Sequence, residues 1–241
     1  MLKYYKIFIV IYLIILFLPN SGFSQKNIEN KPEKTEPLLV PAKPLNIDVS
    51  IDDILLNIEK HYNTSGFTAS FTQISVIKAM DITDTAQGKV FIRPPKMMRW
   101  EYETPEKQII LTNGNKLWVF RPDDNQVMTG SAPAYFGDGK GASFLSDIKL
   151  VRKKFTVSLE KNEDSEHYKL KLVPIEKKLD ISKILLSVSK KTWDVVQIAT
   201  YNFYEDETLI NMSHLQFNQN IDDSVFTLQI PEGADVVKLE E

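Results

Sequence analysis

The sequence predicts a mainly β protein of the α+β class, in which an antiparallel sheet curls into an incompletely closed barrel under a helical lid. Two observations lead to this prediction. After about residue 50 the chain consists mostly of apolar and alternating runs, rich in aromatic and β-branched residues and separated by short turns. Helical patterns are few, whereas parallel strands would need a long crossover between each pair. The apolar face of such a sheet must be covered, and the spare helices are the natural cover.

A helix is expected to begin at Ser50. Serine is a favourable N-cap residue, and Asp53 follows in the first turn, where a carboxylate is favourable. Apolar residues then recur every three or four positions, which places them on one face of a helix. They are Ile51, Ile54, Leu55, Ile58 and Tyr62. Gly66 is expected to end this segment.

Strands are expected along most of the remaining chain. The first begins at Phe67, where apolar and hydroxyl side chains alternate. Residues 81–87 are polar and are expected to form a turn. Four β runs follow, and Asn113-Gly114 between the last two is a hairpin signal. The expected strands after the first are residues 90–92, 97–102, 108–112, 116–120, 126–129, 155–159, 168–172, 184–188, 195–204, 208–217 and 226–230.

Residues 130–141 differ in composition from the strands around them. They hold four of the nine glycines of the chain, and glycine permits backbone conformations that other residues avoid. Tyr135 and Phe136 stand among these glycines. We therefore expect a mobile flap with aromatic content here, followed by a short helix at residues 142–148.

Residues 1–24 have the pattern of a secretory signal peptide. Lys3 and Lys6 precede an unbroken apolar run, and Ser24 supplies a small residue at the expected cleavage site. The apolar run is shorter than the roughly 20 residues that a membrane span needs. Export with a cleaved signal peptide is expected, and an uncleaved anchor is the alternative.

The rest of the chain is expected to form a linker and one domain. Residues 25–47 hold four prolines among charged residues, which predicts a disordered linker; a processing relic without function is the alternative. Residues 48–241 are expected to form a single domain. Loss of the signal removes two lysines and changes the formal net charge from −3 to −5, which argues against nucleic-acid binding. The absence of cysteine excludes disulfides and a lipid-attachment cysteine.

No pattern for catalysis or metal binding is present in the sequence. His61, His167 and His214 are scattered, and none has a second ligand at metal-binding spacing. The motifs G-x-S-x-G and H-E-x-x-H and the phosphate-binding loop are missing. Pairs of aspartates fall at expected helix starts and turns, where they satisfy free backbone N–H groups. We expect a protein that is not an enzyme and that needs no cofactor or metal.

The four β runs between residues 88 and 120 are unusually rich in aromatic residues. Their large rings are Phe91, Trp100, Tyr102, Trp118 and Phe120. In an arbitrary β domain such residues would simply form the core. Here no chemistry accompanies them and few helices are available to fill a barrel. These two facts favour a surface that holds an apolar ligand.

One spaced pattern in this stretch is specific. It consists of Arg93-Pro94, Trp100-Glu101-Tyr102, Pro105, Asn113-Gly114 and Trp118-Val119-Phe120. The pattern resembles the hallmark of the outer-membrane lipoprotein carrier proteins, a LolA-like family of periplasmic chaperones. The resemblance extends upstream to residues 67–73 and reappears at residues 226–236. One departure is Met97-Met98, where many relatives place a single apolar residue.

The resemblance implies a hydrophobic cavity between the sheet and its helical lid, which receives the acyl chains of lipoproteins. The residues that would line it are Phe91, Met98, Trp100, Tyr102, Trp118 and Phe120. The resemblance also implies that Arg93 is a latch that hydrogen-bonds the backbone of the lid, since a guanidinium offers five fixed donors. A strand-edge arginine in a weak surface ion pair is the alternative for Arg93.

The function implied is that of a monomeric periplasmic carrier. It would take lipoproteins from an inner-membrane ABC-type releasing complex to an outer-membrane receptor. Three alternatives stay open: a lipid- or glycolipid-binding protein of the same fold, a membrane-interacting β protein, and a lipid hydrolase. A membrane protein would carry an outward apolar band, against which Lys89, Lys169, Lys171 and Lys183 argue. A hydrolase would need the nucleophile motif that the sequence lacks.

Overall fold

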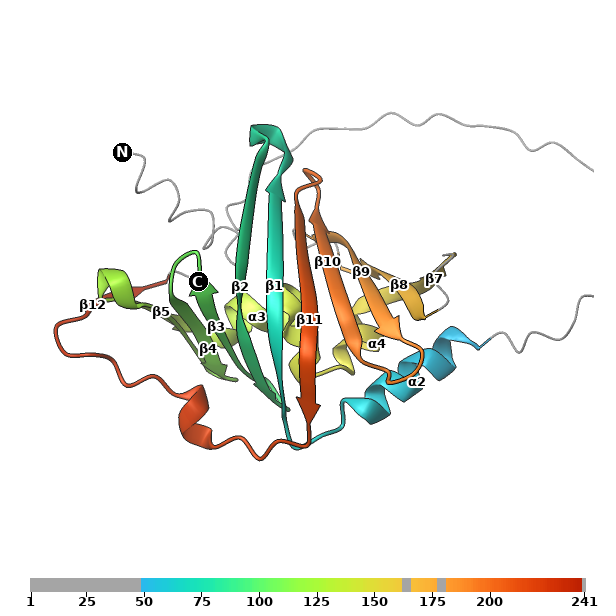
Figure 1. Ribbon diagram of the computed structural model, residues 1–241, viewed down its shortest axis with the longest axis horizontal. Coiled ribbons are helices and arrows are strands. Elements are labelled where there is room, and N and C mark those ends of the chain that lie inside the picture. The colour runs from blue at the N-terminus through green and yellow to red at the C-terminus, as the bar shows by residue number, and fades with distance from the viewer. Residues whose placement is uncertain (1–48, 162–165, 177–180, 240–241) are drawn as a thin grey trace, which may run out of the picture.

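A single open sheet of 12 strands forms the body of the protein in the computed structural model (Figure 1), which describes residues 49–161, 166–176 and 181–239. In chain order the strands are β1 (Phe67–Ile77), β2 (Ile82–Arg93), β3 (Met97–Thr104), β4 (Gln108–Asn113), β5 (Lys116–Arg121), β6 (Gln126–Ser131), β7 (Phe155–Glu160), β8 (His167–Pro174), β9 (Ile181–Ser189), β10 (Val195–Asn202), β11 (Glu207–Phe217) and β12 (Asp235–Lys238). The predicted signal peptide and linker, residues 1–24 and 25–47, lie outside the described residues.

The sheet consists of two antiparallel meanders that meet in its middle. Its strand order is β12-β6-β5-β4-β3-β2-β1-β11-β10-β9-β8-β7. β1 pairs with β11 and joins the meander β1–β6 to the meander β7–β11. The short strand β12 is the exception, because it runs parallel to β6. β7 and β12 are the two edges, so the sheet does not close, and the predicted fold class is confirmed.

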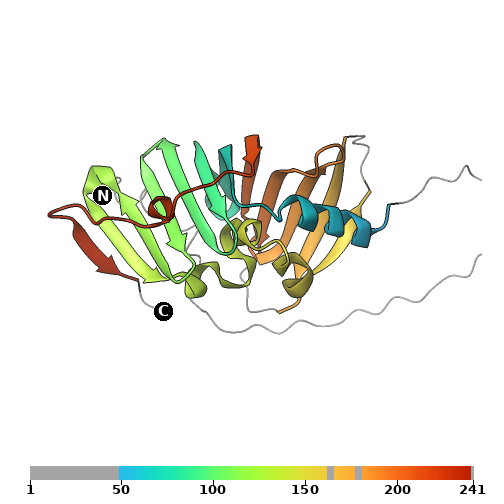
Figure 2. The same cartoon turned by 90° about the horizontal axis from the view of Figure 1, so that it is seen from below.

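Short helices lie against one face of the curved sheet, as Figure 2 shows. They are α2 (Ile51–His61), α3 (Ala132–Phe136), the 3₁₀ segment η3 (Gly137–Ser146) and α4 (Leu150–Lys154). We call residues 132–154, which comprise α3, η3 and α4, the cover. Helix α2 begins as predicted, because the Ser50 hydroxyl accepts a hydrogen bond of 3.1 Å from the Asp53 N–H.

The strand periodicity of two divides the sheet into two faces. On the face beneath the helices, which we call the cover face, the buried side chains of alternate strand positions pack against α2 and the cover. On the other side, the outer face, a smaller cluster of Leu111, Trp118 and Val127 packs against Leu228. Two separate apolar surfaces therefore share the same strands.

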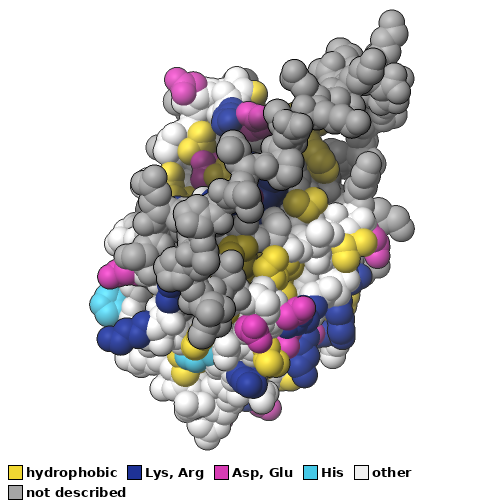
Figure 3. Space-filling view, turned by 90° about the vertical axis from the view of Figure 1, so that its right-hand side faces the viewer, with side chains coloured by type: hydrophobic (Ala, Val, Ile, Leu, Met, Phe, Trp, Pro, Cys, Tyr) yellow, Lys and Arg dark blue, Asp and Glu magenta, His cyan; other side chains and the backbone are white. Residues whose placement is uncertain are grey.

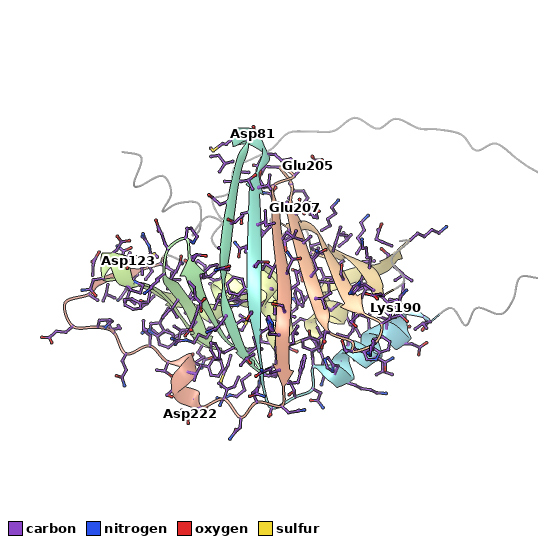
Figure 4. The ribbon with its side chains drawn as sticks, viewed as in Figure 1. Asp81, Asp123, Lys190, Glu205, Glu207 and Asp222 are labelled. Carbon is purple, nitrogen blue, oxygen red and sulfur yellow. The ribbon has the colours of Figure 1, made fainter. Side chains whose placement is uncertain are left out.

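The β1–β2 hairpin is longer than the sequence predicts. Residues 82–87, predicted to form a turn, belong to β2 and pair with β1 up to the turn η1 (Lys78–Met80) and Asp81. Figure 4 shows Asp81 at the tip of this hairpin, which projects beyond the strands on either side. Residues 82–87 are not buried, so this part of the strand has no apolar alternation from which it could be recognised.

Two further predictions need correction. The glycine-rich stretch, predicted as a loop before a helix at residues 142–148, is helical from Ala132 to Ser146, and the last helix there is α4. The strand predicted at residues 226–230 is wrong, because the 3₁₀ turn η4 (Asp223–Phe226) occupies its start and the final strand is β12. Phe226 is only 1% exposed, so its apolar character reflects burial against the sheet and not strand pairing.

Candidate functional site

Strand β3 supplies the centre of the apolar surface beneath the cover. Met98, Trp100 and Tyr102 are 1%, 5% and 7% exposed and alternate with side chains of the outer face. All three belong to the cluster that the sheet forms with the helices. The segment η3 lies against β2 and β3. Three of the six predicted ligand-binding residues therefore lie together on the cover face.

Aromatic packing fixes the rings on this face. The Phe71 ring lies 4.9 Å from that of Trp100 and 5.0 Å from that of Tyr102, in edge-to-face geometry that aromatic quadrupoles favour. Gly88 of β2 lies between Phe71 and Tyr102 in the strand register. A Cβ atom at Gly88 would lie 1.8 Å from the Glu101 carbonyl oxygen. Glycine is therefore required here, and without a side chain on β2 the two rings meet across it.

The cover closes on the sheet with apolar side chains. Phe144, Leu145 and Val151 are at most 2% exposed and pack in the same cluster as β3. One backbone hydrogen bond ties the cover to the turn after β2, because the Lys96 N–H donates to the Ser146 carbonyl over 3.3 Å. Apolar contacts are non-directional, so an alkyl chain can replace them.

The predicted flap residues are packed in this conformation. Phe136 is 9% exposed and belongs to the apolar cluster, and Tyr135 packs against that cluster. Tyr135 also lies over Gly130 of β6, where an added Cβ would come within 3.0 Å of its ring. The flap therefore forms the start of the closed cover.

An ion-pair network joins the cover to α2. The Arg152 guanidinium donates to the Glu59 carboxylate at 2.6 Å, the Asp52 carboxylate at 2.6 Å and the Asp52 carbonyl at 2.9 Å. At this end of the molecule basic and acidic side chains lie next to each other, as Figure 3 shows. Exposed pairs of this kind contribute little energy individually. Their three bonds nevertheless link α2 and α4 mechanically.

The other predicted lining residues lie on the outer face, which corrects the prediction that all six share one surface. Trp118 is buried with Leu111 and Val127, and Phe120 packs against the same cluster. Phe91 stands between Val90 and Ile92, which both face the cover, so its side chain points to the outer face. Aromatic content identified the strands correctly but did not reveal the direction of each ring.

Arg93 also lies on the outer face, because its neighbour Ile92 faces the cover. Its guanidinium donates to the Ile221 carbonyl at 2.7 Å, pairs with Asp223 and lies 5.2 Å from the Phe226 ring centroid. These partners belong to residues 218–239, which we call the C-terminal segment. The structure thus differs from the prediction of a lid latch, since Arg93 holds the C-terminal segment instead.

The C-terminal segment is the feature that sequence reasoning missed. It crosses the outer face from the end of β11 to β12, and Arg99 donates to its Val225 carbonyl at 3.1 Å. Figure 4 shows Asp222 on this crossing. The Asp222 carboxylate accepts hydrogen bonds from Ser224, which lower the pKa of Asp222. The family resemblance over residues 226–236 was a signal that this segment matters. Its position could not be predicted, because a segment that packs on a sheet without strand pairing has no hydrophobic periodicity.

One histidine contact was equally invisible in the sequence. His61 Nε2 lies 2.7 Å from the Asp194 carboxylate, 133 positions away in the chain. The His61 ring also packs on Phe217, with centroids 4.1 Å apart.

Within the described residues, no group of three potential metal-binding side chains occurs. None of the helices in that part of the chain is long and apolar enough to cross a bilayer.

Comparisons with known proteins agree with this architecture. The model of the family described as "Outer membrane lipoprotein carrier protein LolA" matches residues 62–229. An outer-membrane lipoprotein carrier protein of Coxiella burnetii is 31% identical over 178 residues, which cover 73% of this chain and 82% of the relative. Another, from Methylobacillus flagellatus, is 27% identical over 175 residues, which cover 73% and 83%.

A solved structure shows that the fold is shared more widely. An uncharacterized conserved protein from Thermus thermophilus aligns with a TM-score of 0.52 at 14% identity, covering 78% of this chain and 98% of that chain. The family model spans well over half of the 241 residues, including β1 to β11. The resemblance carried by the aromatic strands is therefore confirmed, and the chain belongs to the outer membrane lipoprotein carrier protein (LolA) family.

Proposed function

We propose that this protein is a periplasmic carrier that holds the acyl chains of lipoproteins between the cover face of the sheet and the cover. The observation that carries the proposal is the position of Met98, Trp100 and Tyr102. They form an apolar surface on a continuous sheet, and short helical segments cover it through apolar contacts. A cover of this kind can be displaced without breaking the sheet.

The free energies of acyl-chain burial and of cover displacement indicate why a cover helps a carrier to release its cargo. Burying an acyl chain of about fifteen methylenes yields on the order of 12 kcal/mol, at roughly 0.8 kcal/mol each. Displacing the cover exposes Phe144, Leu145 and Val151, which costs about 1.5–3 kcal/mol per side chain. The difference of roughly 3–7 kcal/mol is favourable, yet small enough for release. The cost of displacing the cover therefore lowers the affinity for the acyl chain. A carrier without its own energy source needs this lower affinity in order to release its cargo.

The route of the cargo follows from the same proposal. We infer that the signal at residues 1–24 exports the chain to the periplasm. The carrier takes lipoproteins from an inner-membrane ABC-type complex, binds them as a monomer, and passes them to an outer-membrane receptor. Transfer to that receptor is downhill if the receptor offers a more apolar site that has no cover to displace. The reaction involves no covalent step, so the protein is not an enzyme.

The proposal is tested by identifying and displacing the ligand. The protein is purified from a cell envelope, and bound lipid or lipoprotein is identified by mass spectrometry. A fluorescent fatty-acid probe is then titrated and displaced with a triacylated peptide. We expect displaceable binding at about one probe per molecule, since one cover closes one face. Probe binding that a glycolipid reverses, but the triacylated peptide does not, would establish the alternative cargo. Absence of displaceable binding would contradict both.

A further inference from the structure

A band of buried polar groups ends the apolar stretch of the cover face. Along β1 the inward positions change from Phe71 to Gln73 and Ser75, and along β4 they change from Ile110 to Gln108. On β3 the last buried inward residue is Tyr102, which pairs directly with Gln108. We call Gln73, Ser75, Tyr102, Gln108 and Arg121 the polar band. Each is 9% exposed or less.

Most polar side chains of the band have a hydrogen-bond or ion-pair partner. The Tyr102 hydroxyl donates to Gln73 Oε1 at 3.0 Å, and Gln73 Nε2 donates to the Ser75 hydroxyl at 3.1 Å. Burial raises the pKa of Tyr102 well above its usual range, so the hydroxyl stays protonated and acts as a donor. Arg121 continues the band on β5, next to Gln108, and its charge is balanced by an ion pair with Asp124.

Gln108 is the exception in the band. Its side-chain nitrogen Nε2 is buried and has no hydrogen-bond partner among the residues that the structure describes. A buried N–H without an acceptor is costly, and natural proteins rarely keep one without a reason. The group is a neutral donor, and the charge of the neighbouring Arg121 is already compensated. An acceptor that suits this position is a neutral oxygen, not a phosphate or a carboxylate.

We propose that the polar band is the head-group end of the acyl-binding face, where Gln108 Nε2 donates to a carbonyl oxygen of an ester- or amide-linked acyl chain. This inference rests on the proposed function. An alkyl chain lying over Met98 and Trp100 reaches the band where its apolar part ends. The first polar atom at that end of any acyl chain is its carbonyl oxygen. The band thus distinguishes acylated cargo from plain hydrocarbon and fixes the depth of the chain.

The test compares two glycerolipids of equal chain length, dioctanoylglycerol and the dioctyl ether of glycerol, which lacks both carbonyls. Their dissociation constants are measured by displacement of the fatty-acid probe. For the natural chain we expect the ester to bind about tenfold more tightly, the effect of one hydrogen bond to a buried donor. Gln108→Leu should reduce this ratio to about one through weaker ester binding. Its melting temperature should be unchanged or higher, because an unpartnered amide is removed.

Gln87→Leu is the matched control, since Gln87 lies exposed on β2 and faces away from the cover. Its ester-to-ether ratio should equal that of the natural chain. An equal affinity for both lipids in the natural chain would overturn the role of the band and leave the proposed function intact. An ester preference that survives Gln108→Leu would also overturn it. Failure of both lipids to displace the probe would contradict the acyl-binding function itself, and the band with it.

Discussion

At the scale of single residues, the direction of a side chain decides its role. Trp100 and Trp118 both belong to the aromatic pattern of the family, and both are 5% exposed. Trp100 lies beneath the cover, whereas Trp118 lies beneath the C-terminal segment on the other face. The same residue type with the same burial therefore serves two surfaces, and only one of them is the candidate binding face.

This difference predicts distinct effects of two identical substitutions. Trp100→Ala and Trp118→Ala should each lower the free energy of unfolding by about 3–5 kcal/mol, the usual cost of truncating a buried tryptophan. Only Trp100→Ala should also change probe affinity per folded molecule, because only its ring faces the cover. Denaturant unfolding and probe titration measure the two effects separately. A change of probe affinity in Trp118→Ala, with none in Trp100→Ala, would reverse our assignment of the faces.

At the scale of elements, two segments without strand pairing cover the two faces. Over the sheet the cover packs mainly through apolar contacts, and its Arg152 ion pairs to α2 are exposed. The C-terminal segment adds backbone bonds from the half-buried arginines Arg93 and Arg99 to the apolar packing of Leu228. The directional bonds of Arg93 hold a segment that we expect to stay in place. The replaceable contacts belong to the segment that we expect to move.

Arg93→Leu should loosen the C-terminal segment. It removes charge-assisted hydrogen bonds worth about 1.5–3 kcal/mol, of which the share from the largely exposed Asp223 is small. Limited proteolysis should cut residues 218–239 faster. Probe affinity should stay within about twofold of its original value, a smaller change than the loss of one hydrogen bond to the probe would cause. Arg93→Lys should be intermediate because lysine keeps the charge and loses the fork. Tighter probe binding in Arg93→Leu would instead support the lid latch suggested by the family pattern.

The cover should respond to cargo whereas the C-terminal segment should not. Hydrogen exchange is measured with and without bound triacylated peptide. Amides of residues 132–154 should change their exchange rates on loading, because an acyl chain replaces the contacts of Phe144 and Leu145. Residues 221–228 serve as the internal reference. Identical exchange in the cover in both states would show that cargo does not enter beneath it.

At the scale of the whole molecule, the sequence predicts the class of the fold better than its covering segments. Alternation and turn residues located nearly all strands of the two meanders, since most of these strands bury one face and β4 and β5 form apolar runs that bury both. They failed where that condition fails: in residues 82–87, which are not buried, and at Phe226, which is buried without pairing. The same limit applied to the candidate site, where local patterns located the strands but not the direction of each side chain. The aromatic strands were identified, but the faces of Phe91, Trp118 and Phe120 required the register.

The contact between Arg93 and the C-terminal segment could not be read from the sequence for a related reason. It joins residues almost 130 positions apart through a backbone carbonyl, and any residue type supplies such a carbonyl. The polar band was hidden likewise, because Gln73 and Gln108 look like ordinary strand residues until their common face is known. Long-range register is set by the whole sheet and not by any local window.

The central claim is that cargo enters only when the cover leaves the sheet, and a reversible cross-link tests it most directly. The chain has no cysteine, so Lys96→Cys with Ser146→Cys introduces one pair where a backbone hydrogen bond joins the cover to the turn after β2. Each single variant is the control. The oxidised double variant should lose uptake of the fatty-acid probe, and reduction should restore it to the level of the single variants. Equal uptake by the oxidised and reduced forms would contradict the account.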